Sequence, residues 1–183
     1  LADIGGGHNV VSSVFVECGA GYRDSGPEHL RPIGEIEFVN DIVAKGAGGG
    51  DNQPRVAAGI VGFADLTMGR ELEIVLAAMT AAGNGRFRGL RHGATWHASP
   101  AIRNSHTRPP EHLLRMDAYR EGVELLGKLD LSFDAWCYHH QLPDLVDLAR
   151  SCPGTPMVLN HLGGPLGIGP YAGCADQVFE QWR

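Results

Sequence analysis

Five apolar runs, each followed by a segment of helical character, are the feature that most restricts the fold of this chain. The runs are centred near Val14, Val56, Phe87, Leu131 and Met157. The clearest helical segment is Glu71–Ala82, which is rich in strong helix formers and is followed by Gly83. Strict alternation of strands and helices predicts a parallel sheet whose strands are joined by right-handed crossovers.

Two kinds of parallel fold compete for this pattern. A Rossmann sheet carries a glycine fingerprint after its first strand, and the sequence CGAGYR at positions 18–23 does not fit G-x-G-x-x-G. A barrel is therefore favoured. A complete (β/α)8 barrel takes about 250 residues, and five units in 183 residues are too few to close one. The sequence thus predicts an α/β fold that is part of a TIM barrel.

Composition and charge exclude several classes of function. The formal net charge is −6 and no run of Lys or Arg exceeds an isolated pair, so we expect no nucleic-acid partner. The four cysteines are far apart and form no C-x-x-C, which favours reduced thiols in a cytoplasm. No apolar stretch approaches the roughly 20 residues of a membrane span, and no signal-peptide order is visible. We therefore expect a cytoplasmic protein without membrane contact.

The stretch Leu131–Leu166 holds the main candidates for chemistry, because its two apolar runs both end on histidine. The first run leads into His139 and His140, and the second leads into His161. Parallel strands present their carboxyl ends at one edge, where α/β proteins place their sites. A histidine there suits metal ligation or general acid–base work. The alternative for His161 is a strand-end imidazole bonded to a loop carbonyl.

Alternation along a strand lets only one of two adjacent histidines face the barrel axis. We predict that this residue is His139, because Asp134, Trp136 and Tyr138 set the opposite phase; the alternative is that the strand has already ended at this point. His140 is then expected to point away. The alternative is that both are ordinary surface histidines.

Arginines gather near the end of the run Phe87–Trp96. Arg88 and Arg91 lie there, with Trp96 just behind them. A guanidinium at a strand end could hold a carboxylate bidentately, and the indole could form an apolar wall beside it. The alternative for each arginine is a salt bridge between neighbouring strand ends. The clustering favours Arg91 as the functional residue.

The sequence leaves open the roles of Glu17, His92 and His97. Glu17 ends an apolar strand, where an acid requires a partner, and an ion pair with an arginine is the simplest one. The connection His97–Pro110 is longer than usual, which is typical of lids and mobile surface loops. His92 and His97 fall in or near this segment.

Several segments together resemble the amidohydrolase-related family of TIM-barrel metal-dependent hydrolases. These segments are VFVECGAGYR, VGFADL, FRGLRHGATW, SFDAWCYHHQLPDLVDLA and VLNHLGGPLG. The family includes sugar-acid lactonases and 2-pyrone-4,6-dicarboxylate lactonases, with decarboxylases as more distant relatives. The resemblance spans nearly all of the chain. It implies one incomplete domain over residues 1–183 that contains about strands two to six of the barrel with their helices.

The resemblance also implies roles for particular positions. His161 matches the histidine of the sixth strand, Arg88 and Arg91 fall on the fourth strand, and Tyr138 and His139 fall at the end of the fifth. The H-x-H pair of the first strand and the aspartate of the eighth have no counterpart here. Together with the missing initial methionine, this predicts that the chain is a fragment of a longer enzyme.

The family's chemistry suggests that the intact enzyme opens a lactone or similar cyclic ester of a carboxylated or sugar-acid small molecule. His161 would ligate a divalent cation, Zn or Mn, or polarise the carbonyl, and His139 would assist. Arg91 and Arg88 would hold the substrate carboxylate, with Trp96 and Tyr138 contacting the substrate. Some relatives need no metal. The alternatives are a metal-dependent decarboxylase and an inactive fragment or binding remnant, and a homo-oligomer of the intact parent is left open.

Overall fold

The computed structural model of the protein describes residues 7–46 and 54–183. Its described residues fall into two compact units. The first unit contains residues up to Ala64 together with Glu73–Gly89, and the second contains Asp65–Leu72 together with Leu90–Arg183. No helix in the described ranges is long and apolar enough to cross a membrane.

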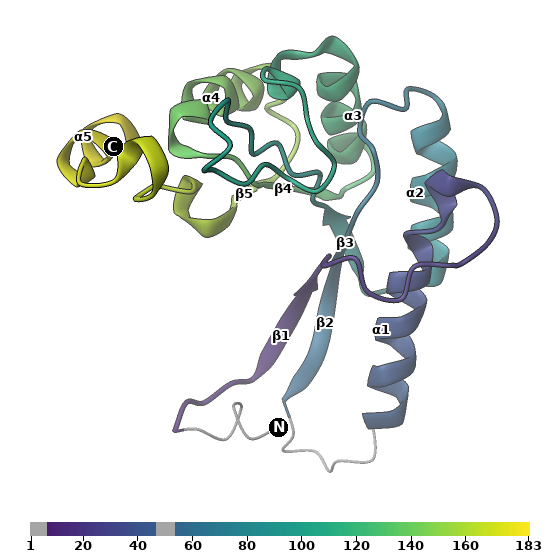
Figure 1. Cartoon of the computed structure of the whole chain (residues 1–183). Coiled ribbons are helices and arrows are strands. Elements are labelled where there is room, and N and C mark those ends of the chain that lie inside the picture. Colours follow the sequence, from purple (N-terminus) through teal and green to yellow (C-terminus); the bar gives the residue numbers. More distant parts are fainter. Residues whose placement is uncertain (1–6, 47–53) are drawn as a thin grey trace. The chain divides into compact units, whose positions relative to one another are not determined.

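Five strands follow one another in the sheet order β1-β2-β3-β4-β5, with helices between them (Figure 1). They are β1 Ser12–Val16, β2 Arg55–Gly62, β3 Phe87–Leu90, β4 Ser132–Ala135 and β5 Met157–Leu159. Strand β1 pairs in parallel with β2, and β4 pairs in parallel with β5. The alternation and strand order are those of part of a (β/α)8 barrel, which confirms the predicted fold class.

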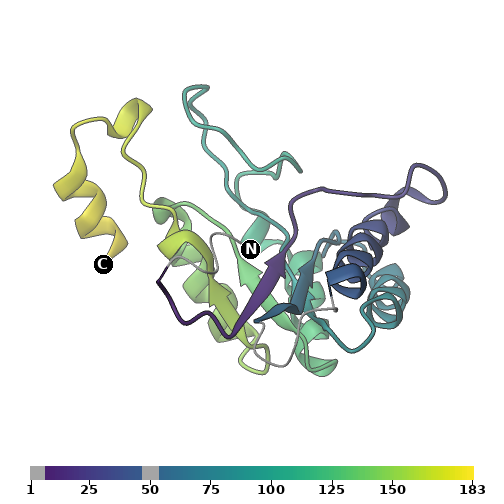
Figure 2. The same ribbon diagram turned by 90° about the horizontal axis from the view of Figure 1, so that it is seen from below.

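In the first unit, α1 (Ile33–Gly46) and α2 (Glu71–Ala82) run side by side (Figures 1 and 2). Asn40, in the middle of α1, contacts the C-terminal end of α2: its Nδ2 donates to the Ala82 carbonyl at 2.6 Å, and its Oδ1 accepts from Arg86 at 2.6 Å. The helix predicted at Glu71–Ala82 is confirmed residue for residue.

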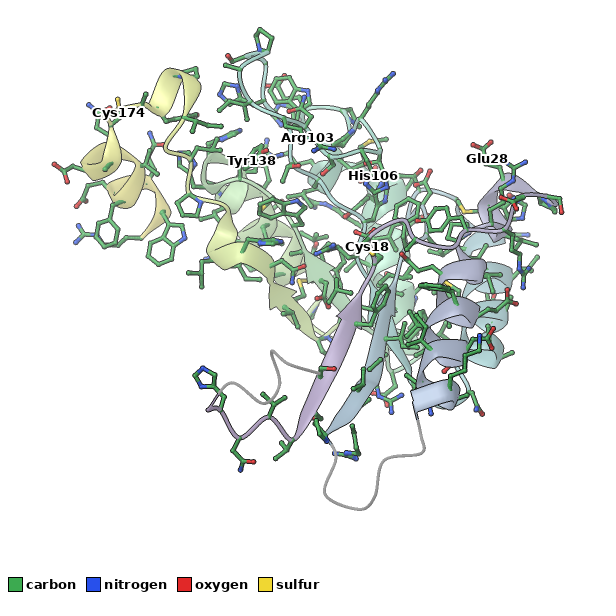
Figure 3. The ribbon with its side chains drawn as sticks, turned by 60° about the horizontal axis from the view of Figure 1, so that its bottom comes forward. Cys18, Glu28, Arg103, His106, Tyr138 and Cys174 are labelled. Atoms are coloured by element: carbon green, nitrogen blue, oxygen red, sulfur yellow. The ribbon has the colours of Figure 1, made fainter. Side chains whose placement is uncertain are left out.

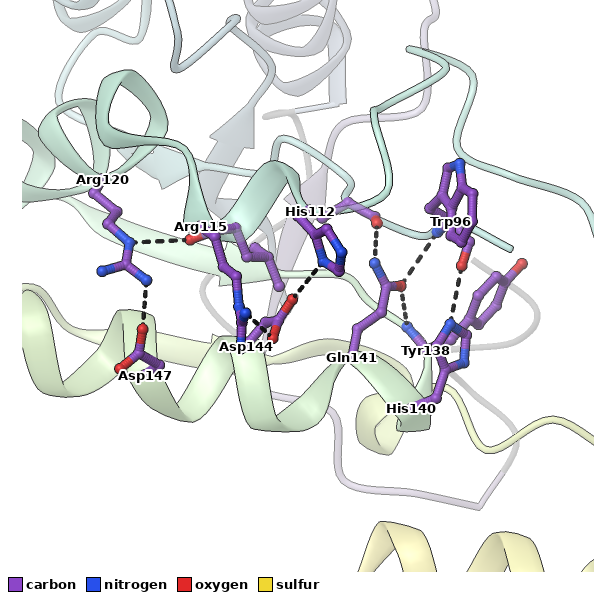
Figure 4. A network of polar contacts seen from close by, with 11 residues as sticks. Trp96, His112, Arg115, Arg120, Tyr138, His140, Gln141, Asp144 and Asp147 are labelled. Carbon is purple, nitrogen blue, oxygen red and sulfur yellow. Dashed lines mark hydrogen bonds and ion pairs between the residues drawn. The ribbon is translucent and has the colours of Figure 1, made fainter. Parts of the chain in front are cut away.

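In the second unit, ion pairs join the 3-10 turn Leu113–Arg115 and two helices on their exposed sides (Figure 4). The helices are α3 (Asp117–Lys128) and α4 (Leu142–Ser151). Arg120 of α3 pairs with Asp147 of α4, and Arg115 donates to Asp144 of α4 at 2.8 Å. Beneath them the side chains of Tyr119, Leu126, Phe133 and Leu148 are fully buried and form the core. The last helix is α5 (Ala175–Trp182).

Two strands of the second unit end earlier than the apolar runs indicate. The run Leu131–Tyr138 forms a strand only as far as Ala135, and a 3-10 turn, His139–Gln141, leads directly into α4. The run ending at Asn160 forms a strand only to Leu159, followed by a turn over Asn160–Gly163. The candidate histidines therefore lie on turns beyond the strands, which frees their orientation from strand alternation.

Candidate active site

The alternation of β4 is opposite to the one predicted. Phe133 packs its ring on Tyr119 of α3, with centroids 5.9 Å apart, so it faces the helices. Asp134 faces the other way and accepts a hydrogen bond from Asn160 Nδ2 at 3.0 Å. The predicted phase was wrong because it extended a two-residue period through His139, although the strand ends at Ala135. Asp134 is thus a candidate site residue that the sequence reasoning assigned to the outer face.

Residues from three strand ends form a continuous polar chain in the second unit. Arg91, just after β3, donates from Nη1 to Asn160 Oδ1 at 3.3 Å, and Asn160 in turn donates to Asp134 of β4. Asp134 is only 5% exposed. Burial raises the pKa of the Asp134 carboxyl above its ordinary value, while the Asn160 hydrogen bond and the Arg91 charge act in the lowering direction. Asn160 therefore links a guanidinium to a buried carboxyl.

His161 follows Asn160 directly and is exposed. Its imidazole lies against the indole of Trp136, with ring centroids 4.3 Å apart. Among the residues described, none makes a hydrogen bond to either of its ring nitrogens. The imidazole is therefore available to a ligand, and the functional role of His161 stays a prediction.

His139 is fully buried, and its ring lies 4.8 Å from that of Tyr171. Neither ring nitrogen has a hydrogen bond of good geometry within the described residues, although the Gln181 side chain is close enough to act on it. Burial lowers the pKa of His139, while Gln181 and the Gly164 carbonyl act to raise it. We conclude that a neutral imidazole is favoured here.

His140 lies beside His139, with ring centroids 5.5 Å apart. It does not simply point to solvent: its Nε2 is 3.1 Å from the Trp96 carbonyl, which accepts the hydrogen bond. Burial lowers the pKa of His140, and the neighbouring His139 lowers it further. The ring of His97 also packs edge-on against His140 at 5.4 Å. His97, His139 and His140 thus form one cluster of ring contacts.

Gln141 is a positioning residue that the sequence reasoning missed. Its Oε1 accepts from the backbone N–H groups of Trp96 and Tyr138 at 3.2 and 3.1 Å, and its Nε2 donates to the Ala94 carbonyl at 2.8 Å (Figure 4). One buried amide therefore joins the segment after β3 to the segment after β4. A glutamine next to two histidines gives no signal of this role in sequence, because its three partners lie elsewhere in the chain.

Trp96 and Tyr138, the two aromatic residues predicted to contact the substrate, differ in their exposure. Trp96 is partly exposed beside the His140 contact. Tyr138 is buried, and its hydroxyl donates to the Arg103 carbonyl, the two residues being neighbours in Figure 3. The Tyr138 hydroxyl therefore holds the long loop after β3. Arg88 belongs to the first unit, where its side chain donates to the Phe87 carbonyl at 2.9 Å.

The role of His92, which the sequence left open, is explained by its surroundings in the structure. It is 5% exposed, and its Nδ1 accepts the Leu66 N–H at 3.2 Å. Burial lowers the pKa of His92 to about 4, with the charge of Asp65 opposing that shift and His106 adding to it. Its backbone carbonyl accepts the Tyr119 hydroxyl at 2.7 Å. A buried neutral imidazole acting as an acceptor explains this residue without a catalytic role.

The predicted metal site is not assembled by the described residues. No three His, Cys, Asp or Glu side chains among them converge so as to hold a metal ion. His161 could supply one ligand, and a zinc site ordinarily takes three or four. The donor set on these residues therefore does not fit a complete metal centre.

The comparisons with known proteins define the class. The sequence profile of the family described as Amidohydrolase matches residues 16–183. Because this match covers most of the chain, the protein belongs to the amidohydrolase family. A curated relative, the uncharacterized protein y4mH of Sinorhizobium fredii (strain NBRC 101917 / NGR234), is 28% identical over 162 residues, which are 88% of this chain. The chain spans about half the length of this relative, 48%.

Two solved structures share the fold. Both are crystal structures of an amidohydrolase from Burkholderia multivorans, one with bound HEPES and one with bound Zn. The first aligns with a TM-score of 0.53 over 95% of this chain and 62% of that one, and the second with 0.56 over 94% and 63%. Both are 19% identical to this chain, so they establish the fold alone.

Proposed function

We propose that this chain is part of a hydrolase that opens a lactone or similar cyclic ester of a carboxylated or sugar-acid small molecule. The observation that carries the proposal is the Arg91–Asn160 hydrogen bond at 3.3 Å, which fixes a guanidinium beside the residue that precedes His161. The Arg91 guanidinium, for a substrate carboxylate, and the His161 imidazole, for the ester carbonyl, therefore both follow the carboxyl ends of strands.

The substrate carboxylate would be recognised by Arg91. A guanidinium presents N–H donors in a planar fork that matches a carboxylate, and Asn160 accepts a hydrogen bond from Nη1 of Arg91. Asn160 is itself oriented by Asp134, so the arginine is held by a chain that ends in the protein interior. Pre-organisation of this kind favours substrate positioning.

The ester carbonyl would be polarised by His161, whose ring nitrogens are engaged by no described residue. His139, Tyr138 and Trp96 are proposed to line the same site. His161 could be one ligand of a divalent ion, Zn or Mn, only if residues outside the described ones supplied the others. Since the described residues do not complete such a site, the steps assigned here are those of the protein's own side chains.

The test is an assay of acid release from a panel of sugar-acid and aromatic lactones, with carbon dioxide release from a panel of aromatic acids measured in parallel. It is run on the 183-residue chain and on a longer polypeptide that contains it. Ester opening liberates a carboxylic acid without carbon dioxide. Carbon dioxide from aromatic acids would instead support the alternative, a decarboxylase on the same scaffold. Turnover by the 183-residue chain itself would exclude an inactive remnant.

Variants of the arginine sharpen this assay. Arg91→Gln should lower kcat/KM on the order of 100-fold, and Arg91→Lys should restore little, because a lysine cannot make the bidentate contact. Arg150→Gln, on the exposed side of α4, is the matched control and should leave turnover unchanged. Equal activity of Arg91→Gln and the parent would refute carboxylate binding by Arg91.

A further inference from the structure

We propose that Trp136 is a positioning residue that fixes the imidazole of His161 at the end of β5. This inference rests on the proposed function, in which His161 acts on the substrate. The indole and imidazole centroids are 4.3 Å apart, with 53° between the ring planes. Such a separation is at the short end of ring–ring contacts in proteins, so the two rings are in direct contact.

The indole itself is held by two glycines from different segments. A Cβ added at Gly93, in the segment after β3, would lie 3.3 Å from Trp136 Cδ1. A Cβ added at Gly164, in the turn after His161, would lie 3.0 Å from Trp136 Cζ3. The five-membered and six-membered ends of the indole are thus each fitted against a glycine backbone. The ring of Tyr138 packs edge-on at 5.7 Å as well.

The backbone at His161 is turned toward this indole by an unusual conformation. His161 and Leu162 have φ values of 49° and 54°, and Gly163 and Gly164 continue with positive φ. Left-handed conformations are unfavourable for residues with a Cβ and persist where the surroundings enforce them. The indole N–H of Trp182 donates to the Leu162 carbonyl, and Gly164 N donates to His161 O at 3.0 Å.

This arrangement orients His161 by packing rather than by hydrogen bonding. An exposed imidazole would otherwise sample several rotamers, and restricting them improves the geometry available to a substrate. A carboxylate or carbonyl partner would fix the ring equally well but would occupy one of its nitrogens. An aromatic ring contact leaves both nitrogens available to the substrate. Trp136 therefore shapes the reactivity of His161 without touching the reacting atoms.

The test is the NMR spectrum of the 183-residue chain with isotope-labelled histidine. The indole ring current should move the Hε1 proton of His161 upfield of that of the exposed His29, which serves as an internal reference. The His161 signal is assigned from its loss in His161→Gln. In Trp136→Leu it should move to the position of the reference, and in Trp136→Phe it should keep part of its shift.

A His161 signal that coincides with the reference in the parent chain, or that Trp136→Leu leaves in place, would overturn the proposal. Circular dichroism shows whether Trp136→Leu is folded. If it is not, Trp136→Phe decides, because an unchanged His161 shift in that variant also contradicts the proposal. Gly164→Ala should displace the indole and move the same signal, whereas Gly154→Ala, whose Cβ meets nothing within 4 Å, should not.

Turnover separates this inference from the proposed function. If His161 is catalytic, Trp136→Leu should lower kcat about tenfold or more with little change in KM, and Trp136→Phe should restore most of it. If the NMR shift behaves as expected while turnover is unaffected, the positioning stands and the role of His161 in the reaction is wrong. If turnover falls while the shift never existed, Trp136 acts in another way and the positioning is wrong.

Discussion

Arg91 Nη1 lies 3.3 Å from Asn160 Oδ1, although 69 residues separate the two in the chain. The same Asn160 donates to the buried Asp134, so one amide satisfies a cation on one side and a carboxyl on the other. An amide is well suited to this place because it carries both an acceptor and a donor. The Arg91–Asn160 contact thus joins the ends of β3 and β5 across β4.

Replacing Asn160 by Ala should destabilise the protein by about 1–3 kcal/mol, since Asp134 would be left buried without its donor. Asn160→Asp should be worse than Ala near neutral pH, because two carboxyl groups would then face each other. Urea unfolding measures both values. Gln177→Ala, at an exposed position of α5, is the control. An Asn160→Ala protein as stable as the parent would contradict the bridging role.

Gln141→Ala should destabilise the protein by about 2–4 kcal/mol, since three backbone groups lose a buried partner. Gln141→Glu tests the single hydrogen bond that the side chain donates to the Ala94 carbonyl. Its carboxylate can still accept from Trp96 and Tyr138, but it cannot donate to the Ala94 carbonyl and would repel it. We expect an intermediate stability at pH 7, and we expect the deficit relative to the parent to shrink as the glutamate is protonated, measured by thermal denaturation of both proteins at pH 7 and pH 5. A deficit that is equal at the two pH values would argue against the Ala94 contact.

Because of His92, the free energy of unfolding should decrease as the pH falls. The pKa of His92 in the folded protein is lowered to about 4 from the ordinary 6.5, chiefly by burial, so the unfolded chain binds the proton first. Its contribution to stability is therefore complete above about pH 6.5. It is lost as the pH falls toward 4, by about 3 kcal/mol at most.

The His92 contribution is isolated by comparing urea unfolding of the parent and His92→Asn at pH 7.5, 6 and 4.5. The asparagine oxygen can accept the Leu66 N–H in place of Nδ1 but does not titrate in this range. His92→Asn should therefore lose less stability with acid than the parent. His29→Asn, at an exposed position, should follow the parent curve. Parallel curves for the parent and His92→Asn would show that this imidazole is not the source.

Gly122 of α3 should not accept alanine, although alanine is normally preferred inside a helix. A Cβ at this position would lie 2.2 Å from the Leu66 carbonyl oxygen. Gly122→Ala should therefore lower stability by about 1–3 kcal/mol, because the helix must move away from residue 66. Gly154→Ala is again the open control. A more stable Gly122→Ala protein would mean that α3 can shift without loss.

Much of the fold could be predicted from local patterns. The alternation of apolar runs with helical segments gave the parallel sheet and the partial barrel, and the composition of Glu71–Ala82 located α2 to the residue. The residue types at the strand ends also indicated chemistry there. Arg91 forms a hydrogen bond with Asn160, and His161 is the residue that follows Asn160 in the chain. The amidohydrolase resemblance is confirmed by the family match over residues 16–183.

The sequence by itself determined which elements form and in what order, because propensity and hydrophobic period are local properties. Only the tertiary structure decided where β4 ends, and with it that Asp134 rather than Phe133 faces Asn160. It also decided the left-handed turn at His161 and the three partners of Gln141. These features depend on contacts between residues tens of positions apart, and such contacts can override the conformations that a residue prefers locally.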